Sequence, residues 1–265
     1  MIRLDKYLAD SGFGTRNEVR SLVKSGSVFV NEILIKDPGY KLNPDADEVS
    51  IKGRSVEYSE FEYYMLHKPA GVITASRDKN AKTVVDLIET RKRRDLFPIG
   101  RLDKDTEGLL IITNDGALSH RLLSPGSHVE KKYAAFVSGE IPDDIETHFQ
   151  NGIDIGDEKL TLPAGLREIT DIEQLLSEKN DSYIRERYTE CISKIDSSEN
   201  KIRIFEITLT EGRYHEIKRM FEALGGKVEY LKRYSMGPIE LDHELSPGEY
   251  RKLNDEEMKN LLTSK

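Results

Sequence analysis

The sequence predicts an α+β protein of two domains, and three observations support this. Apolar and β-branched runs over residues 109–113, 133–137 and 202–209 have the length and composition of buried strands. Apolar residues at helical spacing occur over 3–11 and 16–24. Strand and helix patterns do not alternate regularly along the chain, which favours α+β over a βαβ fold. A chain of 265 residues is long enough for a small domain followed by a medium-sized one.

Residues 1–59 are predicted to form the first domain, a helix–helix–hairpin unit. Leu4, Tyr7 and Leu8 share one face of a helix over 3–11. Thr15, followed by Glu18 three residues later, forms a capping box that predicts a second helix over 16–24. Alternating Val and Ile over 28–35 predict a β-hairpin, and the polar residues 53–60 are predicted to form a linker.

The two predicted helices of this domain carry basic residues that suit docking on phosphates by shape and charge. As an alternative, these residues form only the solvated side of an ordinary small helical domain. The candidate RNA-binding residues are Arg3, Lys6, Arg16, Arg20 and Lys24.

Residues 60–265 are predicted to form the second domain. It begins with a strand, a turn over 68–71 and a second strand. The basic cluster 91–94 is predicted to end a helix, where it either complements the helix dipole or contacts RNA. Residues 168–199 hold four Lys or Arg against nine Asp or Glu, a net charge of −5, and the segment 170–200 is predicted to be a surface insertion, helical in part.

The stretch GRLDKDTEGLLIITNDG over 100–116 contains the most informative carboxylate. Asp103 lies in a polar loop between Arg101 and Lys104, a few residues before the predicted strand 109–113. A carboxylate held ahead of a rigid strand can act as a nucleophile or a base. The alternative interpretation is a surface acid that pairs with a neighbouring arginine.

The stretch LTEGRYHEIKRMFEALGG over 209–226 is the second dense motif. Gly212 turns the chain after a strand, and a helix is predicted from about 214 to 224. Arg213, His215 and Arg219 lie at or near the start of this helix, where cations oppose the helix dipole. An anionic partner therefore explains the cluster better than a structural role alone.

Composition excludes several classes of function. The chain has a single cysteine, Cys191, and its six histidines show no metal-ligand spacing, so neither a disulfide framework nor a metal site is expected. No apolar run approaches the roughly 20 residues needed to cross a bilayer, and the amino-terminal MIRLDKYLADSG lacks the apolar core of a signal peptide. We therefore expect a cytoplasmic protein without a membrane partner. The net charge of −8 argues against nucleic-acid binding by bulk attraction, although basic segments on one face can still bind a polyanion.

Taken together, these motifs resemble the RsuA-type pseudouridine synthases, which modify ribosomal RNA. RLDKYLADSGFGTRNEVRSLVKSGSVFVN over 3–31 resembles the ribosomal-protein S-four (alpha-L) RNA-binding module. HKPAGVIT, GRLD, EKKY and EGRYHEIKRMF then follow in the family's order. The resemblance covers nearly the whole chain except 171–200. It implies a catalytic domain built on a mixed, mainly antiparallel sheet with flanking helices, and a reaction without a cofactor.

The resemblance also implies roles for individual residues. Asp103 falls on the essential aspartate, Tyr133 on the active-site tyrosine, and Lys218 on the basic residue that pairs with the aspartate, where related families have arginine. Arg101 falls near the flipped base, and Arg213 and His215 are further candidates for substrate binding.

The implied function is isomerisation of one uridine to pseudouridine in small-subunit (16S) ribosomal RNA. The sequences SPGSHVEKKY and YHEIKRMF favour this branch over large-subunit (23S) enzymes, which are the main alternative. A non-catalytic ribosome-assembly factor is the alternative from another class, and DNA binding by the first two helices has little support. The expected partner is ribosomal RNA within an assembly intermediate, bound by a monomer.

Overall fold

The computed structural model describes residues 1–89, 95–194 and 201–263 and divides the chain into two compact units. The first unit holds Met1–Tyr63 together with Ile88–Phe97 and Thr113–Asp115, and the second holds the remaining residues. The domain boundary between residues 59 and 60 stays a prediction. The basic cluster 91–94 lies outside the described residues.

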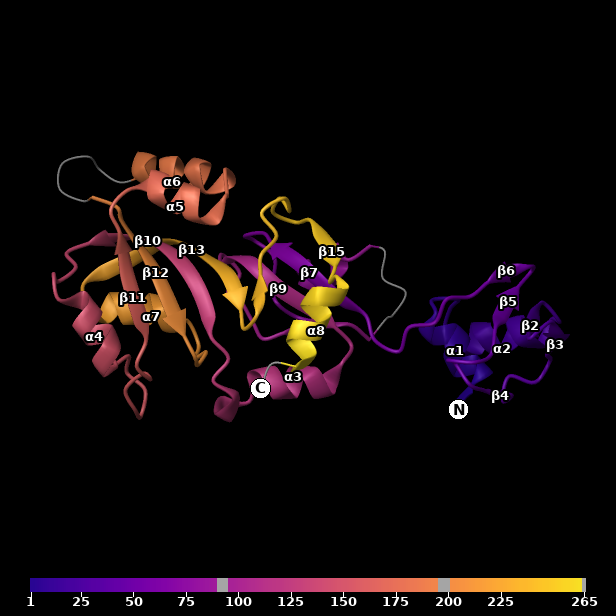
Figure 1. Ribbon diagram of the computed structural model, residues 1–265. Coiled ribbons are helices and arrows are strands. Elements are labelled where there is room, and N and C mark those ends of the chain that lie inside the picture. Colours follow the sequence, from indigo (N-terminus) through magenta and orange to yellow (C-terminus); the bar gives the residue numbers. More distant parts are fainter. Residues whose placement is uncertain (90–94, 195–200, 264–265) are drawn as a thin grey trace. The chain divides into compact units, whose positions relative to one another are not determined.

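In the first unit, two helices pack against short strands, as predicted (Figure 1). Thr15 caps the second helix: its hydroxyl accepts from the Glu18 amide at 3.4 Å, and the Glu18 carboxylate accepts from the Thr15 amide at 2.6 Å. Val19 and Val23 are fully buried. The elements are α1 (Leu4–Asp10), α2 (Arg16–Lys24), β1 (Ile2–Arg3), β2 (Val28–Val30), β3 (Ile33–Leu34), β4 (Lys41–Leu42), β5 (Val49–Ile51) and β6 (Arg54–Ser55).

The prediction of a linker over 53–60 is wrong for most of its length. Strand β6 pairs with β5, Val56 is buried, and the ring of Tyr58 stacks on Tyr7 with centroids 4.6 Å apart. The polar composition of this stretch concealed two side chains that complete the core of the first unit.

A nine-stranded mixed sheet organises the second unit (Figure 1). Its strands run in the order β11-β12-β10-β13-β9-β7-β15; β14 pairs with β13, and β8 with β9. The pairs β11–β12, β12–β10, β10–β13, β13–β14 and β7–β15 are antiparallel, whereas β13 and β9 are parallel. The strands are β7 (Tyr63–Lys68), β8 (Phe97–Ile99), β9 (Glu107–Thr113), β10 (Lys131–Gly139), β11 (Gly165–Ile169), β12 (Arg203–Leu209), β13 (Gly226–Met236), β14 (Ile239–Glu240) and β15 (Tyr250–Lys252).

The three strands predicted from apolar runs are confirmed as β9, β10 and β12. The second strand predicted after the turn at 68–71 is absent; that segment makes only an isolated bridge between Ile73 and Thr83. Two short 3₁₀ helices, Val84–Leu87 and Pro125–Ser127, lie in the connections.

Helices cover both faces of the sheet. The ring of Phe221 in α7 (Glu216–Ala223) packs against Phe149 of α4 (Ile145–Asn151) and Phe205 of β12. Because side chains alternate along a strand, Phe136 of β10 lies on the opposite face, where it belongs to a cluster with α5 (Ile172–Lys179) and α6 (Tyr183–Lys194). Two further helices, α3 (Gly116–Leu123) and α8 (Asp255–Thr263), are joined by a hydrogen bond from Arg121 to the Leu261 carbonyl.

The acidic segment is helical over α5 and α6, as predicted in part, and within 171–194 these helices pack on the sheet through a few apolar side chains. Leu175 and Ile184 are fully buried against the sheet, and Cys191 is 7% exposed. Between the two helices, Asp181 forms a buried ion pair with Lys232 of β13 at 2.6 Å. The prediction of a surface insertion rested on the net charge of the segment, which does not show that a few of its residues face inward. Residues 195–200 lie outside the described part of the chain.

Gly108 allows β9 to approach β13 closely. It has φ +105°, and a Cβ built on it would lie 2.2 Å from the carbonyl oxygen of Arg233. Only glycine satisfies both the backbone angle and the contact. This approach sets the position of β9, and therefore of the loop that precedes it.

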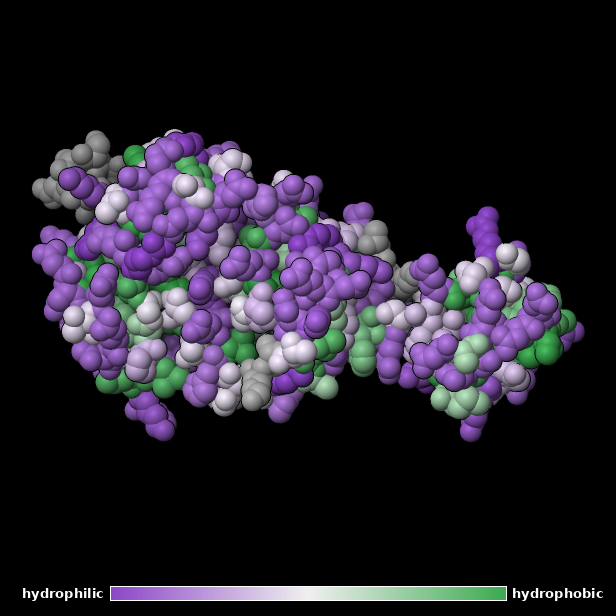
Figure 2. Space-filling view, viewed as in Figure 1, coloured by the Kyte–Doolittle hydropathy of each residue, from purple (hydrophilic) through white to green (hydrophobic). Residues whose placement is uncertain are grey.

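Hydrophilic side chains cover most of the face shown in Figure 2, and apolar ones form small separate patches. Among the helices in the described part of the chain, none has both the length and the hydrophobicity needed to cross a membrane.

Substitution Gly108→Ala is expected to destabilise the second unit strongly. Backbone strain and overpacking each cost about 1–3 kcal/mol, and both apply here, so the free energy of unfolding falls by about 3 kcal/mol or more. Urea unfolding of the full chain measures this. Gly116→Ala is the matched control, because a Cβ there meets no atom within 4 Å; equal stability of the two variants would contradict the role given to Gly108.

Candidate active site

The loop that carries Asp103 is held by the segment 68–74. Lys68 has no exposed surface, and its ammonium donates hydrogen bonds to the carbonyls of Lys104 at 3.2 Å and Thr106 at 2.8 Å. Thr74 Oγ1 donates to the Leu102 carbonyl at 2.6 Å. The backbone is therefore fixed on both sides of Asp103.

Asp103 meets two side chains of the second motif. Its Oδ2 lies 3.1 Å from Lys218 Nζ, and its Oδ1 lies 3.5 Å from His215 Nε2. The side chains of Asp103 and Lys218 are 24% and 23% exposed, so the pair is largely covered yet reachable. Lys218 also binds Asp105 at 2.5 Å. Burial lowers the pKa of Lys218, but the hydrogen bonds that its ammonium donates to the two carboxylates outweigh burial and raise the pKa overall, so the lysine stays protonated.

Helix α7 positions Lys218 because its other face is anchored in the core. Ile217, Met220 and Phe221 are buried as predicted. The helix begins at Glu216, two residues later than predicted, because His215 adopts a left-handed conformation with φ 49° and ends the preceding loop. This conformation is uncommon for a residue other than glycine.

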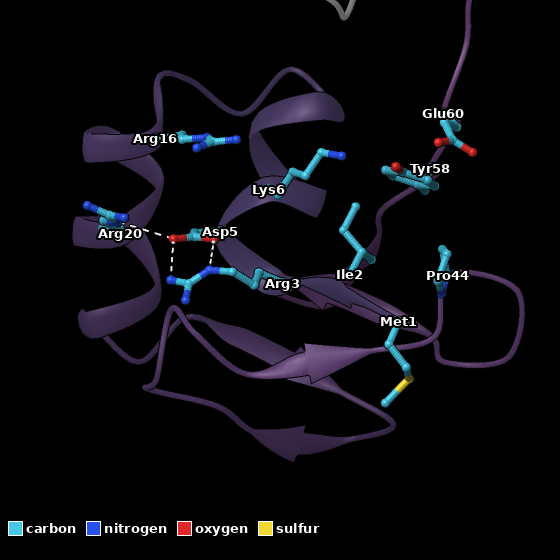
Figure 3. A pocket seen from close by; sticks show the side chains of 10 residues that line it. All are labelled: Met1, Ile2, Arg3, Asp5, Lys6, Arg16, Arg20, Pro44, Tyr58 and Glu60. Atoms are coloured by element: carbon cyan, nitrogen blue, oxygen red, sulfur yellow. Dashed lines mark hydrogen bonds and ion pairs between the residues drawn. The ribbon is translucent and has the colours of Figure 1, made fainter.

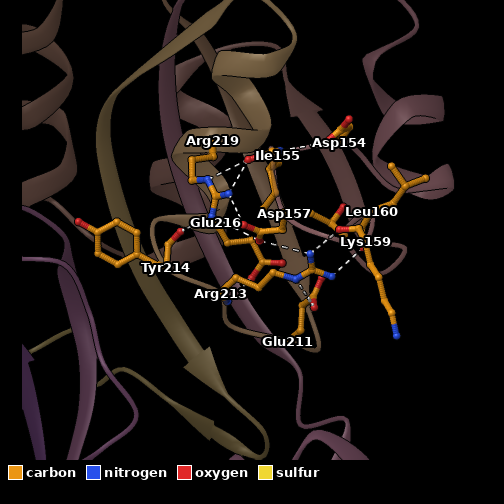
Figure 4. A network of polar contacts seen from close by, with 12 residues as sticks. Asp154, Ile155, Asp157, Lys159, Leu160, Glu211, Arg213, Tyr214, Glu216 and Arg219 are labelled. Atoms are coloured by element: carbon orange, nitrogen blue, oxygen red, sulfur yellow. Dashed lines mark hydrogen bonds and ion pairs between the residues drawn. The ribbon is translucent and has the colours of Figure 1, made fainter.

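Arg213 and Arg219 have anionic partners within the chain (Figure 4). Arg219 binds Asp157 at 2.5 Å and the carbonyl of Ile155, while Arg213 donates to the carbonyls of Lys159 and Leu160 at 2.7 Å each. The predicted anion for this cluster is thus supplied by the chain itself. Both arginines clasp the loop 154–160 onto the start of α7.

Glu216 belongs to the same network, and its side chain is buried. Its Oε2 accepts from the Arg213 amide at 2.9 Å, whereas Oε1 is buried without a donor. Burial and the neighbouring Glu211 carboxylate raise the pKa of Glu216 to about 7. Protonation turns the orphaned oxygen into a donor toward Glu211.

The remaining predicted substrate residues lie in different settings. Tyr133 on β10 is 9% exposed. It pairs with Ile207 and is two residues from Ala135, which pairs with Phe205, so it lies on the sheet face that α7 covers. Arg101 is exposed in the loop before Asp103.

Four of the five predicted RNA-binding residues line one cavity of about 400 Å³ in the first unit (Figure 3). Asp5, 2% exposed, holds Arg3 at 2.9 Å and Arg20 at 3.1 Å. Hydrogen bonds from Arg3 outweigh burial and lower the pKa of Asp5 to about 2. Lys24 is exposed but does not line the cavity. The lining residues are Met1, Ile2, Arg3, Asp5, Lys6, Arg16, Arg20, Pro44, Tyr58 and Glu60.

Within the described residues, no group of three or more His, Cys, Asp or Glu side chains is arranged to hold a metal ion.

The sequence analysis did not identify Lys68, Thr74 or Asp157 as residues that shape the site. For Lys68 a signal existed, because a lysine ends the apolar run YYMLHK.

Comparisons with known proteins identify the family of this chain. The family model described as RNA pseudouridylate synthase matches residues 62–223, and the S4 domain model matches residues 2–48. The chain is 40% identical to "Uncharacterized RNA pseudouridine synthase YtzG" of Bacillus subtilis, covering 97% of each chain. It is 38% identical to "Ribosomal small subunit pseudouridine synthase A" of Vibrio cholerae, covering 97% of this chain and 98% of the relative. A crystal structure of a pseudouridylate synthase, 30% identical, aligns over 98% of this chain and all of its own, with a TM-score of 0.60.

The raised pKa of Glu216 predicts a defined pH dependence of stability. Between its ordinary value of 4.5 and about 7, the folded chain holds a proton that the unfolded chain releases. The contribution of this proton to the free energy of unfolding is present in full below pH 4.5 and is lost as the pH rises through about 7.

Glu216→Gln mimics the protonated side chain. We expect this variant to be more stable than wild type at pH 8, on the order of 1–3 kcal/mol, with the difference shrinking toward pH 5. Urea unfolding at several pH values measures it, with Glu222→Gln, an exposed position on the same helix, as the matched control. A constant difference across this pH range would contradict the assignment.

Proposed function

We propose that this chain, which belongs to the RNA pseudouridylate synthase family, converts one uridine of small-subunit (16S) ribosomal RNA to pseudouridine. The substrate is supported by relatives from Vibrio, Pasteurella and Salmonella named ribosomal small subunit pseudouridine synthase A, which are 33–38% identical over nearly the whole chain. The observation that carries the proposal is the Asp103 carboxylate, fixed by its loop and held 3.1 Å from Lys218.

The reaction exchanges one bond of the nucleotide for another. The N1–C1′ glycosidic bond breaks, the base turns, and a C5–C1′ bond forms; C5 loses a proton and N1 gains one. Nothing is oxidised. The target base must leave its stack, which costs a few kcal/mol. We assign Asp103 as the group that acts on this extruded nucleotide, and Tyr133 as the ring against which the base is held, since such stacking contributes about 1–3 kcal/mol.

Positioning has to supply much of the rate. One acid or base group contributes about 10²–10⁴-fold, whereas enzymes accelerate reactions by at least about 10⁶-fold. A fixed loop and a fixed cation reduce the reorganisation needed at the reacting atoms. In this scheme, Lys218 orients the Asp103 carboxylate, and Arg101 and His215 contact the substrate.

The first unit is proposed to bind RNA phosphates through Arg3, Lys6, Arg16, Arg20 and Lys24. Arg3 and Arg20, whose guanidinium groups Asp5 holds, both line the cavity of Figure 3, which supports this role. We further propose that a monomer acts in the cytoplasm, without a cofactor, on RNA in an assembling ribosomal particle. We also propose that Arg213 contributes to substrate binding by fixing the 212–215 loop.

Incubation of the purified chain with protein-free 16S RNA, 23S RNA and small-subunit assembly particles, followed by mapping of pseudouridine, tests the substrate. The proposal expects one site in 16S RNA. A site in 23S RNA would identify a large-subunit enzyme, and no site in any sample would favour a non-catalytic assembly factor.

Asp103→Asn is expected to abolish turnover while RNA affinity changes little, because it removes the charge and keeps the shape. Release of tritium from C5-labelled uridine in RNA measures turnover, with a loss of at least about 10²-fold. The matched control is Asp105→Asn, which touches the same lysine from a side chain that is 74% exposed and should cost less than about 10-fold. Retained activity in Asp103→Asn would refute the assignment.

Lys218→Met is expected to lower the single-turnover rate at saturating RNA by about 10–10³-fold, because the carboxylate loses its fixed charged partner. Lys218→Arg restores a cation and should recover part of this loss. If the two variants have equal rates, the charge at this position does not act through Asp103.

A further inference from the structure

An exposed aromatic side chain stands beside the candidate active site. Tyr214 as a residue is 76% exposed; among the large hydrophobic residues that the structure describes, only Met1 is more exposed. Figure 4 shows its ring projecting away from the polar network that holds the neighbouring backbone. A tyrosine usually buries its ring and leaves only the hydroxyl in water, so this position is not explained by folding alone.

The ring of Tyr214 is connected to Asp103 through His215. The two rings are stacked, with centroids 3.9 Å apart and planes 16° from parallel. His215 Nε2 then lies 3.5 Å from the Asp103 carboxylate. Tyr214 and His215 therefore form a two-ring stack with one end at the carboxylate and the other end, the outer face of Tyr214, open to solvent.

The loop holds this stack in place from both sides. The Tyr214 carbonyl accepts a hydrogen bond from Arg219 Nη1 at 3.1 Å. The preceding residue, Arg213, is anchored to two carbonyls of the loop 154–160. His215 keeps its left-handed backbone conformation. Ordering the loop costs conformational entropy, and the exposed ring returns no core packing to offset it. A ring held rigid without being packed is preorganised to contact a ligand.

We propose that the outer face of Tyr214 is a stacking platform for a nucleobase adjacent to the extruded uridine. This inference rests on the proposed function. Extrusion leaves the neighbouring base without a stacking partner, and an aromatic ring within two side chains of the reacting carboxylate replaces that partner. Stacking on a tyrosine tolerates any base, so the platform contributes affinity and placement while sequence selection stays with other contacts.

The absence of tryptophan from the chain provides a direct test. Tyr214→Trp creates the only indole and keeps a stacking ring. Titration with protein-free 16S RNA and with small-subunit assembly particles should quench its fluorescence. Ile192→Trp is the control: Ile192 is 48% exposed on α6, which covers the opposite face of the sheet from α7, and its fluorescence should not change.

Further substitutions separate stacking from a structural role. Tyr214→Phe should bind RNA as the wild type does, whereas Tyr214→Ala and Tyr214→Leu should weaken RNA binding about 5- to 150-fold, the range expected for one base–aromatic stack. The single-turnover rate at saturating RNA should change less than the affinity, and thermal unfolding should be unchanged because the ring is exposed.

Two results would overturn the stacking platform: an unquenched Tyr214→Trp variant under saturating RNA, or a Tyr214→Ala variant whose RNA affinity is within twofold of wild type. Either result, with wild type still forming pseudouridine, refutes the platform and leaves the proposed function intact. If wild type forms no pseudouridine but RNA quenches Tyr214→Trp and Tyr214→Ala binds weakly, the platform stands and the proposed function fails.

Discussion

A buried ammonium group holds the loop on which the candidate site depends. Lys68 has no exposed surface, and its three donors go to the backbone carbonyls of Pro69, Lys104 and Thr106. Desolvation lowers its pKa to about 8 despite the nearby carboxylates. Burying a cation is unfavourable unless its hydrogen bonds are satisfied, and here all three are. Removing the lysine would take away its hydrogen bond to the carbonyl of the buried Thr106, so the position of the Asp103 loop depends on a side chain of strand β7.

The second constraint on the candidate site is the position of Lys218. Helix α7 is fixed in the core by Phe221 and at its start by the arginine clasp on Asp157, and it carries Lys218 to the carboxylate. The loop and the helix are separate in sequence by more than 100 residues, and each is ordered independently of the ion pair that joins them. Forming the ion pair therefore costs little additional conformational entropy, because both side chains are already positioned. Such preorganisation is what makes a charged contact effective in catalysis.

Local signals predicted more of this structure than long-range ones. The capping box at Thr15, the strand 109–113 and the apolar face of α7 were recoverable because each depends on residues close in sequence. The ion pair of Asp103 with Lys218 came from the family resemblance, since no spacing rule joins positions so far apart. The clasp on Asp157 and the core contacts of 171–194 were missed for the same reason. The arginine cluster indicated an anionic partner, but which group supplies it, and which residues of an acidic segment face inward, depend on the fold.

The distribution of charge explains how an acidic chain can recognise a polyanion. With a net charge of −8, the chain gains little from general attraction, and several cations near both sites are already neutralised. Asp5 holds Arg3 and Arg20 in the first unit, and Asp157 holds Arg213 and Arg219 in the second. A guanidinium held by a carboxylate releases fewer counterions on binding RNA, yet it presents its remaining donors in a fixed direction. Under the proposed function, RNA recognition by this chain depends on donor geometry and on the proposed stacking rings more than on charge density, which favours a folded RNA site over an arbitrary strand.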